Sequence, residues 1–334
     1  MRFRLYPTPE QEVILRRHCS DARYVWNLAL EQANYWRRSW GPTPSYNVQA
    51  AQLTEARKET WLGCGSVIVQ QQALRDFDRA MHNFFIGAHN RPTWRKAGVH
   101  EGFRIVHAGR STPRRLNRRW GQVLVPKVGW VRFRWTRQVP ADVKSYRVTL
   151  DRAGRWHIAF AVIPPPIDGP GTGEVVGVDR GVACSAALST GEMWHCPQPD
   201  RLAERRAQRR LSRTTRGSRR REQTRHRLAV VKARGTARRK DWAEKASTDL
   251  ARRFDIIRFE DLKVRGMTRS AKGTIENPGR NVRAKAGLNR GILANGWGVL
   301  LKRTSDKAAG RVELVNPAYT SQRCSCCGHV DGAS

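Results

Sequence analysis

Acidic residues are scarce in this sequence of 334 residues. Asp and Glu together number 28 against 63 Lys and Arg, which gives a formal net charge of +35. A positive charge of this size opposes compaction unless a polyanion neutralises it. The shortage of acids therefore excludes an ordinary metabolic enzyme as the default interpretation and makes nucleic acid the leading class of partner.

Lysine and long apolar runs are scarce as well. Of the 63 basic residues 51 are Arg, whose guanidinium groups suit bidentate contact with phosphate. No apolar run reaches the roughly 18 residues of a membrane span, and the N-terminus lacks the apolar region of a signal peptide. We therefore expect no membrane association and a cytoplasmic protein. Apolar residues still make up 39% of the chain, which suffices for a core and excludes a disordered basic tail.

Cysteine is sparse and shows no disulfide framework. Four of the seven are scattered, and three gather near the end of the chain. Cys324 and Cys327 have the CxxC spacing of a zinc knuckle, with Cys326 as a bystander and His329 as a further candidate ligand. Because structural zinc takes four ligands, this is a half-site for Zn²⁺.

The first half of the chain changes character near residue 100. Before that point, apolar spacings of three and four predict helices. After it, short β-like runs over 103–163 are interrupted by Gly and Pro and include a hairpin around 151–155, which is typical of an antiparallel β module. A Pro- and Gly-rich linker over 164–173 ends this half. The predicted helices cover residues 10–36, 46–60 and 66–86.

Two acidic residues that end apolar runs are the main candidates for catalytic, metal-binding residues. Asp179 ends the run that begins at Glu174, and Glu260 ends the run that begins at Phe254. The presence of either acid alone at the end of an apolar strand is also explained by an ion pair with one of the many arginines. Two such strands in one sheet would instead place both carboxylates on Mg²⁺ or Mn²⁺. Asp261 competes with Glu260, but strand alternation turns it to the other face.

The basic residues concentrate in two windows. Residues 101–140 hold ten Lys or Arg against one acid, and residues 201–240 hold 17 against two. The second window reads as a helical hairpin broken at Gly217, and a charge this dense favours nucleic-acid contact over a merely solvated face. Tryptophans interleaved in the first window either stack on bases or belong to the core. The candidate nucleic-acid contacts are Lys127, Trp130, Arg205, Arg209, Arg213, Arg220 and Arg227.

Between 254 and 315 the pattern weakens and then recovers. Residues 265–291 are rich in Gly, Arg and Asn and predict a loop, and residues 292–309 return to helical spacing. A last short strand follows at 312–315.

Six stretches spread over nearly the whole chain carry distinctive motifs: Arg4–Gln11, Ala22–Asn27, Pro126–Val131, Gly177–Gly181, Phe259–Leu262 and Asn316–Gln322. Together they resemble the TnpB family, small RNA-guided nucleases encoded beside bacterial insertion sequences and related to type V CRISPR effectors. The last three stretches, in this order and spacing, are the most specific.

The resemblance implies an RNA-guided DNA endonuclease that binds a guide RNA from the transposon end and cleaves double-stranded target DNA. It implies a monomeric ribonucleoprotein, associated with the nucleoid when bound to DNA. The family's first two catalytic acids fall on Asp179 and Glu260, which would hold Mg²⁺ (or Mn²⁺). Its zinc-ribbon cysteines fall on Cys324 and Cys327.

The resemblance also implies a multidomain α+β fold. It joins a helical recognition lobe, an antiparallel β-barrel wedge module and a RuvC-like nuclease domain of RNase H fold with the start of a zinc ribbon. The implied bounds are 1–8 and 101–166 for the wedge-like module, 9–100 for the recognition lobe, 174–315 for the nuclease domain with a basic helical insertion at 200–254, and 316–334 for the partial ribbon.

The sequence departs from the family pattern at its end. The second CxxC and the third catalytic Asp of the family would both fall beyond Ser334, so we expect a truncated chain that lacks one catalytic ligand. Three other functions are compatible with the composition. They are a cleavage-deficient RNA-guided repressor, a small type V CRISPR effector and a sequence-independent nucleic-acid chaperone, the last of which gives no reason for the two acids.

Overall fold

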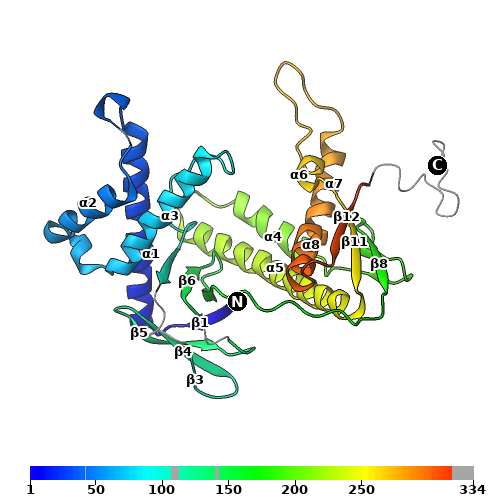
Figure 1. The fold of residues 1–334 in the computed structure, drawn as a ribbon. Coiled ribbons are helices and arrows are strands. Elements are labelled where there is room, and N and C mark those ends of the chain that lie inside the picture. Colours follow the sequence, from blue (N-terminus) through cyan, green and yellow to red (C-terminus); the bar gives the residue numbers. More distant parts are fainter. Residues whose placement is uncertain (42, 107–112, 140–142, 318–334) are drawn as a thin grey trace. The chain divides into compact units, whose positions relative to one another are not determined.

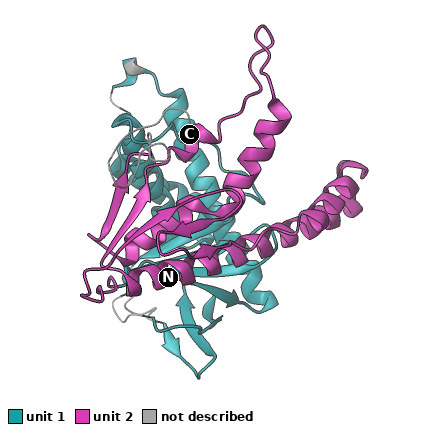
Figure 2. Ribbon diagram, turned by 90° about the vertical axis from the view of Figure 1, so that its right-hand side faces the viewer, with its two compact units in different colours: residues 1–164 teal, residues 165–334 magenta. Residues whose placement is uncertain are grey.

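The computed structural model describes residues 1–41, 43–106, 113–139 and 143–317, which form a mixed α+β fold (Figure 1). The chain divides into two compact units, residues 1–164 and residues 165–334 (Figure 2), and each is described by itself. None of the described helices combines the length and apolar character that crossing a bilayer requires.

The helices of the first unit lie where the apolar spacing predicts them. Helix α1 begins with a capping box in which the Thr8 side chain accepts from the backbone of Gln11 and the Gln11 side chain accepts in return. Its buried face carries Leu15, Val25 and Leu30 and packs on α3. The bounds are α1 Pro9–Tyr35, η1 Arg38–Trp40, α2 Tyr46–Glu59, η2 Trp61–Cys64 and α3 Val67–Phe85.

The sheet of the first unit has the strand order β2-β6-β7-β1-β5-β4-β3, with every pair antiparallel. Strand β1 joins its two halves, because residues 2–4 pair with β7 and residues 5–6 pair with β5. The predicted hairpin is formed by β6 and β7. The bounds are β1 Arg2–Tyr6, β2 Gly102–Val106, β3 Arg114–Arg115, β4 Trp120–Val125, β5 Gly129–Arg134, β6 Ser145–Leu150 and β7 Trp156–Phe160.

The expected closed barrel is wrong for the part of this unit that the structure describes. Closure requires the two end strands to pair, and here β2 and β3 end one linear order. Strand β3 has only two residues, both of them exposed, and so offers too short a ladder for β2.

The sheet of the second unit has the order β10-β9-β8-β11-β12. The first three strands are antiparallel, whereas β8, β11 and β12 run parallel. Strand β8 is central, as its apolar residues on both faces predict. The bounds are β8 Val175–Asp179, β9 Ala186–Leu188, β10 Met193–Trp194, β11 Ile256–Glu260 and β12 Val312–Val315.

Two helices cover one face of this sheet. Leu250 of α5 and Leu300 of α8 join the buried cluster that contains Val178 and Phe259. The predicted helical hairpin is formed by α4 and the first part of α5, with the break at 213–218. The bounds are α4 Arg201–Ser212, α5 Arg219–Arg253, α6 Val264–Met267, α7 Val282–Asn295 and α8 Trp297–Lys307.

The loop predicted over 265–291 is only partly a loop. Helix α6 occupies its start and α7 already begins at Val282. The single helix predicted over 292–309 is instead divided between α7 and α8 by Gly296, whose φ of 69° is left-handed.

Candidate functional site

Asp179 and Glu260 lie side by side at the ends of two adjacent parallel strands. The last residue pair of the β8–β11 ladder joins Val178 to Phe259, so the two acids follow at the same level. Alternation turns both away from the face that α5 and α8 cover. Asp179 is exposed and Glu260 is half-buried. The structure thus brings together the two acids that the sequence analysis singled out.

The two carboxyl groups influence each other's charge. Burial raises the pKa of Glu260, and the neighbouring Asp179 raises this pKa further. Two carboxylates this close repel each other unless a proton or a cation lies between them. The pair is therefore suited to a hard divalent cation.

Arg180 is a buried cation beside this pair that the sequence analysis missed. Its side chain is 3% exposed, its Nη2 donates to the carbonyl oxygen of Glu260, and its guanidinium lies 5.5 Å from the Phe259 ring centroid. Its charge opposes the rise in the pKa of Glu260. A signal was present in the sequence, because Arg180 directly follows the acid in the Gly177–Gly181 motif.

Asp261 does not join the pair. Its carboxylate accepts from Lys263 Nζ at 2.5 Å, and its backbone N–H donates to the carbonyl of Val315 at 2.8 Å. Across the described ranges, no cluster of three or more His, Cys, Asp or Glu side chains is arranged to hold a metal ion. The donor set described here for a cation is therefore the two carboxylates of Asp179 and Glu260.

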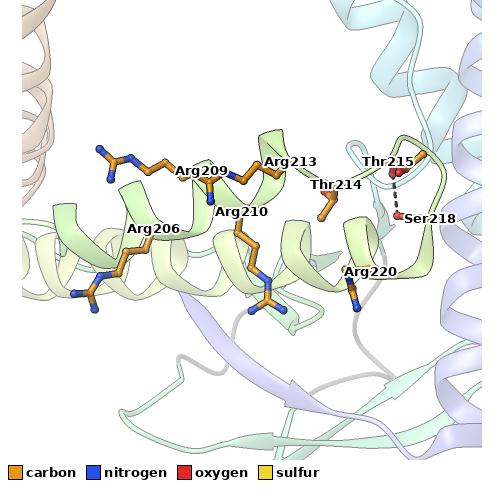
Figure 3. Close-up of a pocket in the computed structure, with 8 residues that line it drawn as sticks. All are labelled: Arg206, Arg209, Arg210, Arg213, Thr214, Thr215, Ser218 and Arg220. Carbon is orange, nitrogen blue, oxygen red and sulfur yellow. Dashed lines mark hydrogen bonds between the residues drawn. The ribbon is translucent and has the colours of Figure 1, made fainter.

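The five arginines predicted to contact nucleic acid lie on the α4–α5 hairpin, and all five are exposed. None of their guanidinium groups has an ion-pair or hydrogen-bond partner among the residues that the structure describes. Three of them, Arg209, Arg213 and Arg220, line an open cavity of about 660 Å³ at the end of the hairpin (Figure 3). The other lining residues are Arg206, Arg210, Thr214, Thr215 and Ser218.

The hairpin is held together by bonds that leave these arginines free. Arg221 Nη1 donates to the carbonyls of Leu211 and Thr214, both at 2.8 Å. Lys232 Nζ lies 3.2 Å from a carboxylate oxygen of Glu204. Neither of these interactions uses the arginines that line the cavity. Their side chains are therefore available to bind anions.

The two candidates in the first unit already have protein partners. Lys127 lies in the β4–β5 turn and donates to the carbonyl of Cys64 at 2.9 Å, so it ties this turn to η2. Trp130 is half-buried, and the guanidinium of Arg114 lies 4.4 Å from its ring centroid. Neither contact excludes nucleic acid, and each also supports the fold.

The predicted zinc ligands Cys324 and Cys327 lie outside the described residues. The expected ribbon therefore stays a prediction.

Comparison with known proteins identifies the family. InsQ of Escherichia coli (strain K12), which is assigned as an RNA-guided DNA endonuclease, is 34% identical over 341 residues, covering 98% of this chain and 83% of InsQ. The chain belongs to the TnpB family. A relative from Streptomyces pristinaespiralis with the same assignment is 32% identical over 347 residues, covering 99% of this chain and 81% of the relative.

Three family profiles match parts of this TnpB member. The profile described as "Probable transposase" matches residues 158–271, and the one described as "Cas12f1-like, TNB domain" matches residues 297–333. A profile described as "Helix-turn-helix domain" matches residues 1–39, where the structure has strand β1 followed by the single long helix α1.

A solved structure described as a CRISPR-Cas12f ternary complex is a distant neighbour. It aligns over 96% of this chain and 74% of its own, at 12% identity and a TM-score of 0.35. A likeness this distant adds nothing to the fold described above.

Proposed function

We propose that this TnpB member is an RNA-guided DNA endonuclease. It binds a guide RNA from the transposon end and cleaves matching double-stranded DNA by metal-dependent hydrolysis of phosphodiester bonds. The proposal rests mainly on the position of Asp179 and Glu260 at the same level, at the ends of two adjacent parallel strands. The assigned activity of the two relatives supports it.

The second unit holds the proposed RuvC-like nuclease domain of RNase H fold, at 174–315 with its basic helical insertion at 200–254. Support comes from its five-stranded sheet, in which an antiparallel hairpin precedes two parallel strands. The first unit holds the proposed recognition lobe at 9–100 and, apart from residues 165 and 166, the proposed wedge-like module at 1–8 and 101–166. Cys324 and Cys327 are the proposed start of a zinc ribbon.

The proposed site residues have distinct roles. Asp179 and Glu260 hold Mg²⁺ (or Mn²⁺), which when bound activates a water and stabilises the leaving oxygen. Arg180 fixes the backbone of Glu260 through its bond to that carbonyl. The arginines of the hairpin hold phosphate backbones, while base pairing with the guide selects the DNA sequence.

A cleavage-deficient repressor is not favoured, since both acids are retained and end adjacent strands at the same level. A small type V CRISPR effector would share this site, and a repeat array beside the gene would distinguish the two. A sequence-independent chaperone leaves the carboxylate pair unexplained.

The test uses the ribonucleoprotein as its host makes it, with DNA that matches its RNA. Asp179→Ala and Glu260→Ala should each lower Mg²⁺-dependent cleavage by at least about 100-fold, since each removes a group that holds the ion. The amount of bound RNA should stay unchanged, because the hairpin arginines are untouched.

Asp261→Ala is the matched control, since Asp261 is the neighbouring acid and is bound to Lys263. It should cleave close to the wild-type rate. Normal cleavage by Asp179→Ala would show that the site is elsewhere.

A further inference from the structure

The loop that follows Asp179 is held by one buried amide. Asn295, the last residue of α7, is 2% exposed. Its Nδ2 donates to the carbonyls of Val182 at 2.8 Å and Gly181 at 3.3 Å. Its Oδ1 accepts from Ser185 Oγ at 2.8 Å and from Gln198 Nε2 at 3.0 Å. Every donor and acceptor position of this amide is therefore used within the protein.

Two further contacts hold the same loop from the same junction. The indole Nε1 of Trp297, the first residue of α8, donates to the carbonyl of Gly181 at 3.2 Å. A Cβ on Gly291 of α7 would lie 2.8 Å from Val182 Cγ1, so the helix and the loop are in close contact there. The left-handed Gly296 between the helices lets Asn295 and Trp297 reach one loop.

The loop needs these contacts because it has no strand ladder of its own. Residues 180–185 lie between β8 and β9 and belong to neither strand. Gly181 is half-buried and Val182 is exposed, and backbone carbonyls outside a ladder take their donors from side chains or water. The carbonyls of Gly181 and Val182 find them in Asn295 and Trp297. The backbone leaving Asp179 is thereby fixed on one side by Arg180 and on the other by the α7–α8 junction.

We propose that Asn295 is a positioning residue for the carboxylate pair, and that Trp297 assists it. By fixing the loop one residue beyond Arg180, Asn295 keeps Asp179 at the distance from Glu260 at which both bind one cation. This inference rests on the proposed function, because it takes these two acids as the metal site. The affinity of the carboxylate pair for a divalent cation then depends on the α7–α8 junction, which contributes no ligand.

The test measures where a bound cation lies, independently of DNA cleavage. Fe²⁺ replaces Mg²⁺ in the ribonucleoprotein, and hydroxyl radicals made at the ion with peroxide and ascorbate cut the polypeptide nearby. Mass spectrometry then follows cuts near residues 179 and 260 against Fe²⁺ concentration. Asn295→Asp keeps the shape of the side chain but removes both donations to the loop.

Asn289→Asp is the matched control on the same helix. Asn289 Nδ2 also donates to two carbonyls, those of Thr268 at 3.0 Å and Arg269 at 3.3 Å, in a loop that does not follow Asp179. We expect Asn295→Asp to raise the Fe²⁺ concentration for half-maximal cutting by about 10-fold or more, the scale seen for residues that orient metal ligands. Asn289→Asp should leave it unchanged. Thermal unfolding of both variants measures any general loss of stability.

If Asn295→Asp does not fold, Trp297→Phe takes its place, since it removes the indole donor and keeps an aromatic ring. It should raise the Fe²⁺ concentration for half-maximal cutting by less than about 10-fold, because Asn295 still holds the loop. Wild-type cutting by whichever variant folds, together with loss of the cuts in Asp179→Ala, would overturn the positioning role and leave the proposed function intact. Unchanged cuts in Asp179→Ala would instead overturn the metal site itself.

Discussion

At the scale of single residues, the site consists of two carboxylates and one buried guanidinium close to one another. Asp179 and Glu260 repel each other, and the buried Arg180 beside them offsets part of that repulsion. The sequence was sufficient to predict where the two acids lie, because each ends an apolar run and strand alternation gives its face. Arg180 was not predicted, since its burial depends on the ring of Phe259 and the carbonyl of Glu260, which only the parallel pairing of β8 and β11 brings near.

The half-buried side chain of His157 gives a prediction for stability. Burial, assisted by the charge of Arg2, lowers the pKa of His157 to about 4, and its ring nitrogen lies 3.1 Å from Asp151. The unfolded chain, with an ordinary histidine pKa near 6.5, therefore takes up a proton first as the pH falls. We expect the free energy of unfolding to fall between about pH 6.5 and pH 4, by roughly 2 kcal/mol from this group.

Denaturant unfolding of the wild type and of His157→Gln across that range measures this contribution. The variant cannot titrate at this position, so the difference in unfolding free energy between the two proteins should change as the pH falls. A constant difference from pH 7 to pH 4 would contradict the assignment.

At the scale of helices and strands, the sequence predicted those elements whose form follows from the local residue pattern, and missed those that depend on long-range packing. The α4–α5 hairpin was predictable because the thin apolar stripe is broken at Gly217. Residues 282–291 of α7 were wrongly predicted as a loop, because they are rich in Gly and Arg and their helical form depends on burial of Ile292 and Asn295 against the rest of the second unit. The open edge of the first sheet was missed for a similar reason, since strand closure depends on long-range pairing.

The arginines of the hairpin give a prediction at this scale. Replacing Arg209, Arg213 and Arg220 together by Ala should weaken RNA binding and make it less sensitive to salt. The slope of log affinity against log salt should fall by about 2 to 3, since each phosphate contact contributes about 0.7 to 0.9. Filter binding at several salt concentrations measures this slope.

A matched triple variant uses arginines of the same unit that are already paired with acids. Arg253, Arg258 and Arg303 have carboxylate partners in Glu192, Glu313 and Glu244. Replacing these three should leave the slope close to wild type. Equal losses of slope in the two triple variants would mean that the hairpin has no special share in binding.

At the scale of the whole molecule, the net charge of +35 affects stability as well as binding, because like charges in the folded chain repel each other. A polyanion that binds the folded chain shifts unfolding to higher temperature by mass action. We expect protein stripped of RNA to unfold several degrees below the ribonucleoprotein, and heparin to recover part of the difference. Calorimetry at low and high salt tests this, because added salt should reduce the gain from heparin. An unfolding temperature that does not respond to heparin at low salt would contradict it.

The most direct measurement of the central claim is an exchange of guide. The guide segment of the bound RNA is replaced by a second sequence, and cleavage of two DNA targets, each matching one guide, is compared in wild type and in Asp179→Asn. We expect Mg²⁺-dependent cleavage to move to the newly matched target in the wild type and to be lost from both targets in the variant, with RNA retained. Cleavage that ignores the guide, or that persists in Asp179→Asn, would contradict it.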